Sequence, residues 1–141
     1  MKKIFIYIGL IITFTILIGC PGNVDGFQSK ELSGGYIYHE PAGLPCIEKE
    51  HSGKGIPGLI YAYDYNSKFI IALAKDLKLP ESKRNELVAE GDFYDYVNKK
   101  GYSKYWIIIH ANDSIYGPFE LEEFLIMRQE LGVSNDLHLN E

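Results

Sequence analysis

The chain has 141 residues, which is room for one ordinary domain. Its apolar fraction of 46% and charged fraction of 23% are those of a globular protein and exclude disorder over most of its length, while eleven Tyr and seven Phe favour sheet structure. The net charge is −5, and without Lys2 and Lys3 it becomes −7, with 12 basic against 19 acidic residues. This acidity argues against nucleic-acid binding and against a polybasic attachment to anionic lipid.

The N-terminal segment has the pattern of a secretory signal peptide. Lys2 and Lys3 form a short positive region, and Ile4 to Ile18 form an apolar stretch of about fifteen residues. As a helix this stretch spans roughly 22 Å, less than the ~30 Å hydrocarbon core of a bilayer. We therefore predict a lipoprotein signal peptide over residues 1–19 rather than an uncleaved membrane anchor, in which Cys20 would be accidental.

The end of this segment, Leu17-Ile18-Gly19-Cys20, resembles the lipobox of bacterial lipoproteins. The resemblance implies that the leader is removed before Cys20, that the Cys20 thiol is diacylglycerylated and that the new amino terminus is often acylated too. Each buried methylene contributes ~0.8 kcal/mol, so two or three acyl chains hold a protein at a membrane. We therefore expect a protein anchored by lipid in the bacterial cell envelope, with its mature domain outside the cytoplasm.

The residues after Cys20 predict a tether and then a single domain. Pro21 to Gly26 have the polar, Gly-containing composition of a flexible linker, and we place the tether at residues 20–34. The domain is then expected at residues 35–133, followed by a polar tail at 134–141.

Strand patterns dominate the first half of this domain. Residues 36–40 predict a first strand, which Pro41 ends. Residues 41–58 hold three Pro and four Gly and form the longest predicted loop. The runs 59–65 and 69–74 predict a hairpin whose second strand is apolar on both faces, as in a central strand.

The second half combines helices and a second hairpin. Residues 80–90 predict a surface helix or loop, and residues 92–101 a short helix capped by Asp92. Residues 105–110 form the strongest strand pattern, and a turn leads to a partner strand over residues 114–117, where Pro118 is expected to block further pairing.

A final helix is predicted at residues 120–131, with acidic residues in its first turn and Gly132 beyond its end. Its apolar face is expected to comprise Leu121, Phe124, Leu125 and Leu131. The predicted fold class is therefore α+β: an antiparallel sheet of four or five strands with the C-terminal helix packed on one face.

The last third of the chain, together with the lipobox, resembles a family of short uncharacterised bacterial lipoproteins, the domain of unknown function 3997. The resemblance lies in Tyr105-Trp106-Ile107-Ile108, Ile115-Tyr116-Gly117-Pro118-Phe119, Glu122-Glu123-Phe124 and Arg128 through Leu131-Gly132. These are packing and turn residues, and the family has no assigned activity, so the resemblance implies no reaction and no cofactor.

The residues that can carry chemistry are few. With Cys20 acylated, Cys46 is the one remaining cysteine, so we expect no disulfide and a buried or half-buried thiol. His39, Cys46 and His51 are weak candidates for a soft-metal set, although their spacing matches no familiar site. No catalytic residue is assigned, and His110, at the end of an apolar strand, is expected to be structural.

Tyr61, Tyr63 and Tyr65 are the candidates for ligand binding, because alternation along a strand would place them on one sheet face. Packing against a helix is the competing interpretation. If the row is exposed, residues 41–58 would give it a wall.

The sequence thus predicts a non-enzymatic envelope module that binds a protein, peptide or glycan, or acts as an inhibitor, with no nucleic-acid partner. The alternative is a metal- or cysteine-dependent envelope enzyme that uses residues 39–51.

Overall fold

The computed structural model describes residues 29–76 and 78–140. The predicted signal peptide, Cys20 and most of the predicted tether lie outside the described residues. Within the described residues no helix is long and apolar enough to cross a membrane.

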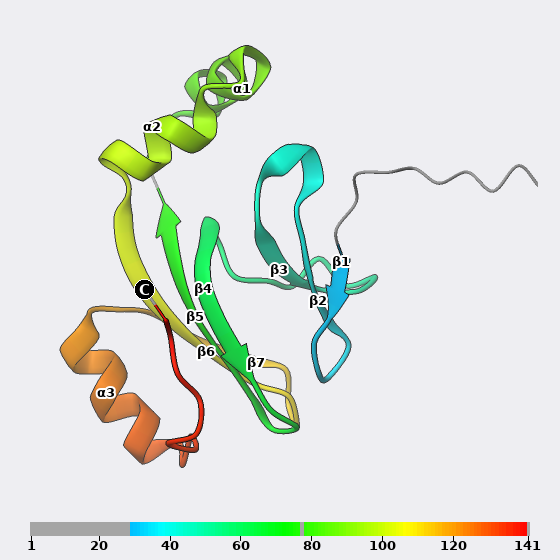
Figure 1. Ribbon diagram of the computed structural model, residues 1–141, viewed down its shortest axis with the longest axis vertical. Coiled ribbons are helices and arrows are strands. Elements are labelled where there is room, and N and C mark those ends of the chain that lie inside the picture. Colours follow the sequence, from blue (N-terminus) through cyan, green and yellow to red (C-terminus); the bar gives the residue numbers. More distant parts are fainter. Residues whose placement is uncertain (1–28, 77, 141) are drawn as a thin grey trace, which may run out of the picture.

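The described chain forms two antiparallel sheets and three α-helices (Figure 1). The larger sheet is a meander of four strands in chain order: β4 (Leu59–Tyr65), β5 (Phe69–Asp76), β6 (Tyr102–Ile109) and β7 (Ser114–Phe119). The smaller sheet contains β1 (Ser29–Glu31), β2 (Tyr36–His39) and β3 (Cys46–Lys49), with a 3-10 turn η1 (Pro41–Gly43) between β2 and β3. The helices are α1 (Glu81–Glu90), α2 (Phe93–Lys100) and α3 (Leu121–Glu130).

The two middle strands of the larger sheet are buried on both faces. Ile70 and Ile108 pack with Tyr36 and Ile47 of the smaller sheet. The neighbouring residues Ile71 and Ile107 point to the opposite face and pack with Phe124 of α3. A third cluster, which joins Leu59 to Leu87, Phe93 and Val97, attaches α1 and α2 to one end of the sheet. The sheet is therefore the middle layer of the domain (Figure 1).

The predicted α+β class is confirmed, and α3 contacts β6 and β7 as expected of a C-terminal helix on one face. The separate three-stranded sheet was not predicted. Residues 46–49, which we expected inside a long loop, pair with β2 over the full length of that strand.

The ordered domain extends beyond the predicted limits of 35 and 133. Ser29–Glu31, expected to belong to the tether, form β1, and Leu32 is buried in the cluster between the two sheets. At the other end Leu137, in the predicted polar tail, is buried under α3. Both corrections have one cause, because an isolated Leu in a polar segment gives no periodic signal.

Pro118 lies inside β7 and does not end it, contrary to our expectation. The ladder between β6 and β7 is irregular between Tyr105 and Ile107, and pairing resumes at Phe119. A proline is tolerated there because β7 is an edge strand and the irregularity removes the need for its amide hydrogen.

The expected apolar face of α3 is also wrong in part. Phe124 is buried, but Leu121 and Leu125 are each 51% exposed. The cluster beneath the helix is completed by Val133 and Leu137 after its end, so the chain that follows α3 takes the place that those two leucines were expected to fill.

Gly117 is the residue that lets β7 lie against the ring of Trp106. It has φ +136°, and a Cβ there would come within 2.6 Å of Trp106 Cε3. We expect Gly117→Ala to lower the free energy of unfolding by about 1–3 kcal/mol, because both the backbone conformation and the ring oppose the methyl group. Urea unfolding followed by circular dichroism measures this loss.

Gly132→Ala is the matched control, since Gly132 also has positive φ but its Cβ would meet nothing within 4 Å. A loss no larger than that of the control would show that the Trp106 ring does not restrict this position.

Candidate functional site

The predicted row of tyrosines on β4 is divided by a β-bulge. The register between β4 and β5 shifts between Ile60 and Ala62, so strict alternation fails at Tyr61. Tyr61 packs with the cluster of α1 and α2, whereas Tyr63 and Tyr65 pack with the cluster between the sheets. The expectation that the three rings share one face is therefore wrong, because a bulge leaves no mark in the apolar pattern.

Tyr63 and Tyr65 are engaged by the smaller sheet. The Tyr63 ring stacks on Tyr38 with centroids 4.7 Å apart. Lys30 of β1 lies over both rings, with its Nζ 5.6 Å from the Tyr63 centroid and 5.2 Å from the Tyr65 centroid. These cation–π contacts hold β1 against β4.

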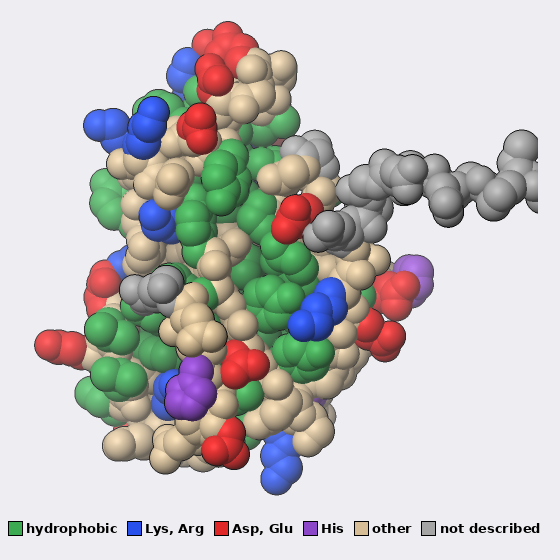
Figure 2. Space-filling model, in the orientation of Figure 1, with side chains coloured by type: hydrophobic (Ala, Val, Ile, Leu, Met, Phe, Trp, Pro, Cys, Tyr) green, Lys and Arg blue, Asp and Glu red, His purple; other side chains and the backbone are tan. Residues whose placement is uncertain are grey.

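Tyr61 instead lines a cavity of about 350 Å³ at the junction of the two sheets and α2, here called the tyrosine pocket. It is lined by Tyr38, Glu40, Gly43, Pro45, Ile60, Tyr61 and Tyr94. Residues of the 41–58 segment thus form one wall beside Tyr61. Figure 2 shows hydrophobic side chains gathered along this seam, with acidic and basic groups beside them.

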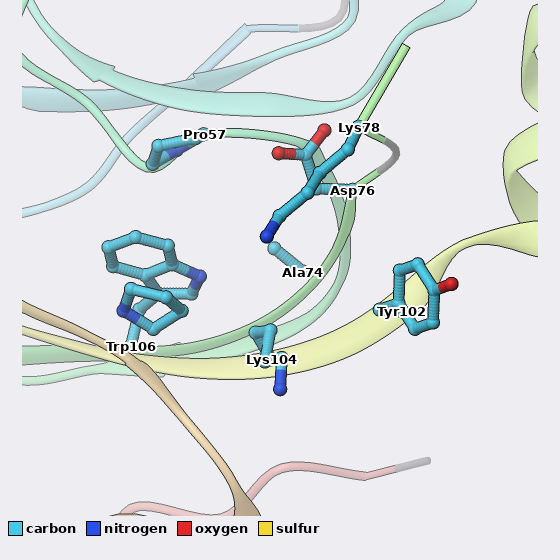
Figure 3. A pocket seen from close by; sticks show the side chains of 8 residues that line it. Pro57, Ala74, Asp76, Lys78, Tyr102, Lys104 and Trp106 are labelled. Atoms are coloured by element: carbon cyan, nitrogen blue, oxygen red, sulfur yellow. The ribbon is translucent and has the colours of Figure 1, made fainter.

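A larger hollow of about 530 Å³ lies on the same face of β5 and β6 as the smaller sheet, beside the part that the smaller sheet covers, and is here called the Trp106 groove (Figure 3). Its lining residues are Pro57, Ala74, Asp76, Lys78, Tyr102, Lys104, Trp106 and Pro118.

Cross-strand pairing explains why these side chains meet. Ala74 pairs with Lys104, and the next pairs on the same face are Ala72 with Trp106 and Asp76 with Tyr102. Small residues on β5 therefore lie opposite large ones on β6, which leaves space above the alanines. Along β6, Trp106 and Tyr102 are about 13 Å apart, so they mark the two ends of the groove in Figure 3.

The indole N–H of Trp106 is buried and has no hydrogen-bond partner among the described residues. Buried tryptophan N–H groups usually find an acceptor, because an unpaired donor costs free energy. In Figure 3, Lys78 reaches across the groove between Trp106 and Tyr102. The groove therefore combines one unsatisfied donor with lysine side chains.

The charges around the groove are unequally matched. Lys104 forms an ion pair with Glu120, and Asp76 lies 3.6 Å from Arg84. Lys78 is exposed and has no ion-pair partner among the described residues. The charge available to a ligand is consequently positive.

Sequence reasoning missed this groove. Its signal was available in β6, where Tyr102, Lys104 and Trp106 alternate on one face opposite the small residues Ala72 and Ala74. The strand pattern was interpreted only as core, because Ile107 and Ile108 dominate it.

The 39–51 region brings together only two of its three candidate ligands. His39 and Cys46 are direct partners across β2 and β3, and His39 Nε2 lies 3.0 Å from Glu48 Oε1. The His51 side chain is 90% exposed in the turn beyond β3, at the opposite end of this hairpin. Among the described residues no group of three or more His, Cys, Asp and Glu is arranged to hold a metal ion.

Cys46 is a half-buried free thiol with little nucleophilic character at neutral pH. Burial, with a smaller contribution from the Glu48 carboxylate, raises the pKa of the thiol to about 11. Because the thiolate is the reactive form, this environment does not support a cysteine nucleophile.

His110 joins the two sheets at the end opposite α1 and α2. Its ring Nδ1 is 3.0 Å from the Ser33 hydroxyl, which donates a hydrogen bond to the carbonyl oxygen of Asn66. Nearby, Lys49 Nζ lies 2.6 Å from Asp113 Oδ1 and also bridges the sheets. These contacts connect the turn after β1 to the two hairpin ends of the larger sheet, so their role is structural.

A comparison with protein-family models supplies the family. The model described as "Protein of unknown function (DUF3997)" matches residues 37–141. The chain belongs to this family. The DUF3997 match confirms the resemblance found in the sequence and extends it from the last third to nearly the whole described domain. It assigns no activity, and neither the curated proteins nor the solved structures contain a match to this chain.

The stability of this DUF3997 domain should depend on the protonation of His110. Burial lowers the pKa of His110 below its ordinary value, an effect that the Lys49 charge adds to and that the Ser67 backbone and Asp113 oppose. The unfolded chain takes up a proton as the pH falls through about 6.5, before the folded chain does. The His110 contribution is therefore complete above pH 6.5 and is lost as the pH falls toward the folded pKa.

We expect the urea midpoint to fall between pH 7.5 and pH 5.5, and His110→Gln to remove most of that dependence. His51→Gln, which changes an exposed histidine, is the control and should retain it. An unchanged slope in His110→Gln would exclude His110 as the group responsible.

Proposed function

We propose that this DUF3997 protein is a lipid-anchored envelope protein whose domain binds a peptide carboxylate in the Trp106 groove and catalyses no reaction. The observation that carries the proposal is the partnerless indole N–H of Trp106, buried at the floor of a groove that also presents Lys78. A carboxylate supplies both the acceptor that the indole lacks and the charge that Lys78 lacks.

The shape of the groove favours a peptide over a glycan. The backbone of Gly117 lies against one face of the Trp106 ring, as the 2.6 Å approach of its Cβ position to Cε3 shows, and the cluster between the sheets contacts the ring as well. Sugars bind tryptophan mainly through an open ring face. What remains here is the part of the ring that lines the groove together with the apolar walls of Pro57 and Pro118. A cavity of about 530 Å³ is within the usual range for a compact ligand.

The anchoring part of the proposal rests on the lipobox that ends at Cys20. Ser29, the first residue of β1, follows Cys20 by nine positions, so a fully extended tether spans at most about 30 Å. The domain would then lie within one domain diameter of the bilayer surface, and the acidic protein would bind there through its lipid alone.

Anchoring can be tested by replacing Cys20. We expect Cys20→Ser to release the protein from the membrane fraction, because the acylated thiol would be its attachment. Immunoblotting of fractionated cells measures the distribution. Cys46→Ser is the matched control and should remain in the membrane fraction. Retention of Cys20→Ser, or an unmodified Met1 at the N-terminus by mass spectrometry, would defeat the assignment.

Ligand binding can be followed through Trp106, which is the only tryptophan of the chain. We expect some member of a panel of short peptides with free carboxyl termini to shift its emission, and the amidated peptide of the same sequence to bind about fivefold more weakly. Lys78→Ala should weaken binding by a similar factor, while Lys100→Ala, which removes an exposed lysine from α2, should not. No shift with any peptide, or equal affinities of the two variants, would refute the proposal.

A further inference from the structure

The tyrosine pocket has a chemistry different from that of the Trp106 groove. None of its lining residues is basic, three are tyrosines, and one is an acid. Glu40 uses its Oε1 atom to accept a hydrogen bond of 2.6 Å from the Tyr38 hydroxyl. Its second carboxylate oxygen forms no hydrogen bond or ion pair with the described residues.

Tyr38 and Tyr61 remain neutral over the physiological range because their pKa values are raised. Burial raises the pKa of Tyr38, with the neighbouring Glu40 adding to the effect, and burial together with Tyr94 raises the pKa of Tyr61 to about 12. Neutral phenol rings keep the negative faces that attract cations.

One ring of the pocket and two rings beside it already attract cations of this chain. Lys75 Nζ lies 4.6 Å from the centroid of Tyr61, and Lys30 lies over Tyr63 and Tyr65. Within the described residues no lysine or arginine lies over Tyr38 or Tyr94. Tyr38 and Tyr94 therefore offer ring surfaces that no cation of the described residues occupies, beside the Glu40 carboxylate.

We infer that the tyrosine pocket binds an alkylammonium group, held beside the rings of Tyr38 and Tyr94 and neutralised by Glu40. Gly43, Pro45 and Ile60 provide an apolar surface for the carbon atoms of such a group. This chemistry is shared by a small quaternary ammonium compound and by a lysine side chain of a partner protein. The site is independent of the Trp106 groove and of the ligand proposed for it.

The test uses the full chain, purified in a nonionic detergent, and calorimetric titration with choline. The control ligand is 3,3-dimethyl-1-butanol, which has the same shape as choline but no charge. We expect choline to bind at least tenfold more tightly than the alcohol, because the attraction is between charge and ring faces as well as between charge and carboxylate. Equal binding of the two compounds, or no binding of choline, would overturn the proposal.

Two variants localise the site. Glu40→Gln keeps an oxygen for the Tyr38 hydroxyl but removes the charge, and Tyr94→Leu removes a ring that is 41% exposed and stacks on Tyr61. Each should weaken choline binding about three- to tenfold. Tyr96→Leu, a change on the same helix outside the pocket, should leave binding unchanged. If Tyr94→Leu and Tyr96→Leu bind choline alike, the cation is bound elsewhere and the inference fails.

The source of the cation is distinguished by a second titration, with N-acetyl-lysine methylamide. Binding of this compound with the same sensitivity to Glu40→Gln supports a protein partner that offers a lysine. A response to choline alone supports a small quaternary ammonium ligand. Both results support an alkylammonium site.

Discussion

The burial of β5 and β6 on both faces determines the position of every other element. Ile70 and Ile108 require a cover on one side and Ile71 and Ile107 on the other, and none of these four side chains is exposed. Fully burying an aliphatic side chain is worth about 1.5–3 kcal/mol, so leaving either face open would remove a large part of the stability of a domain this size. The smaller sheet and α3 are the two covers.

The covers differ in how completely they fit. The smaller sheet has three short strands and lies over a four-stranded one, so part of the larger sheet stays open beside it. The Trp106 groove and the tyrosine pocket both lie along the border of this cover. Lysines surround the first and an acid lines the second, which gives one domain two concave surfaces of opposite electrostatic preference.

Elements whose own residues show a regular pattern of apolar and polar side chains were predictable from the sequence. The hairpin of β4 and β5, strand β6 and helix α3 follow from alternation, apolar runs and capping signals, and they fix the fold class. Strands β1 and β3 were missed because each is short and is stabilised by its partners more than by its own pattern. The position of Tyr61 could not be predicted either, since the bulge beside it depends on the register with β5. The candidate site was the least predictable part of the structure. The groove forms because Ala72 and Ala74 of β5 lie opposite Trp106 and Lys104 of β6, and this pairing cannot be seen in either strand alone.

The contact of Lys30 with Tyr63 and Tyr65 makes the accessibility of these two rings depend on the position of β1. β1 pairs with β2 through only three residues, and it is the first described element of the chain. Besides this short ladder, the Lys30 contacts hold β1 against the larger sheet. Separation of β1 would withdraw the Lys30 ammonium from both tyrosine rings without breaking any strand pairing of the four-stranded sheet. The loss of three backbone pairs would thereby make the aromatic surface of β4 more accessible.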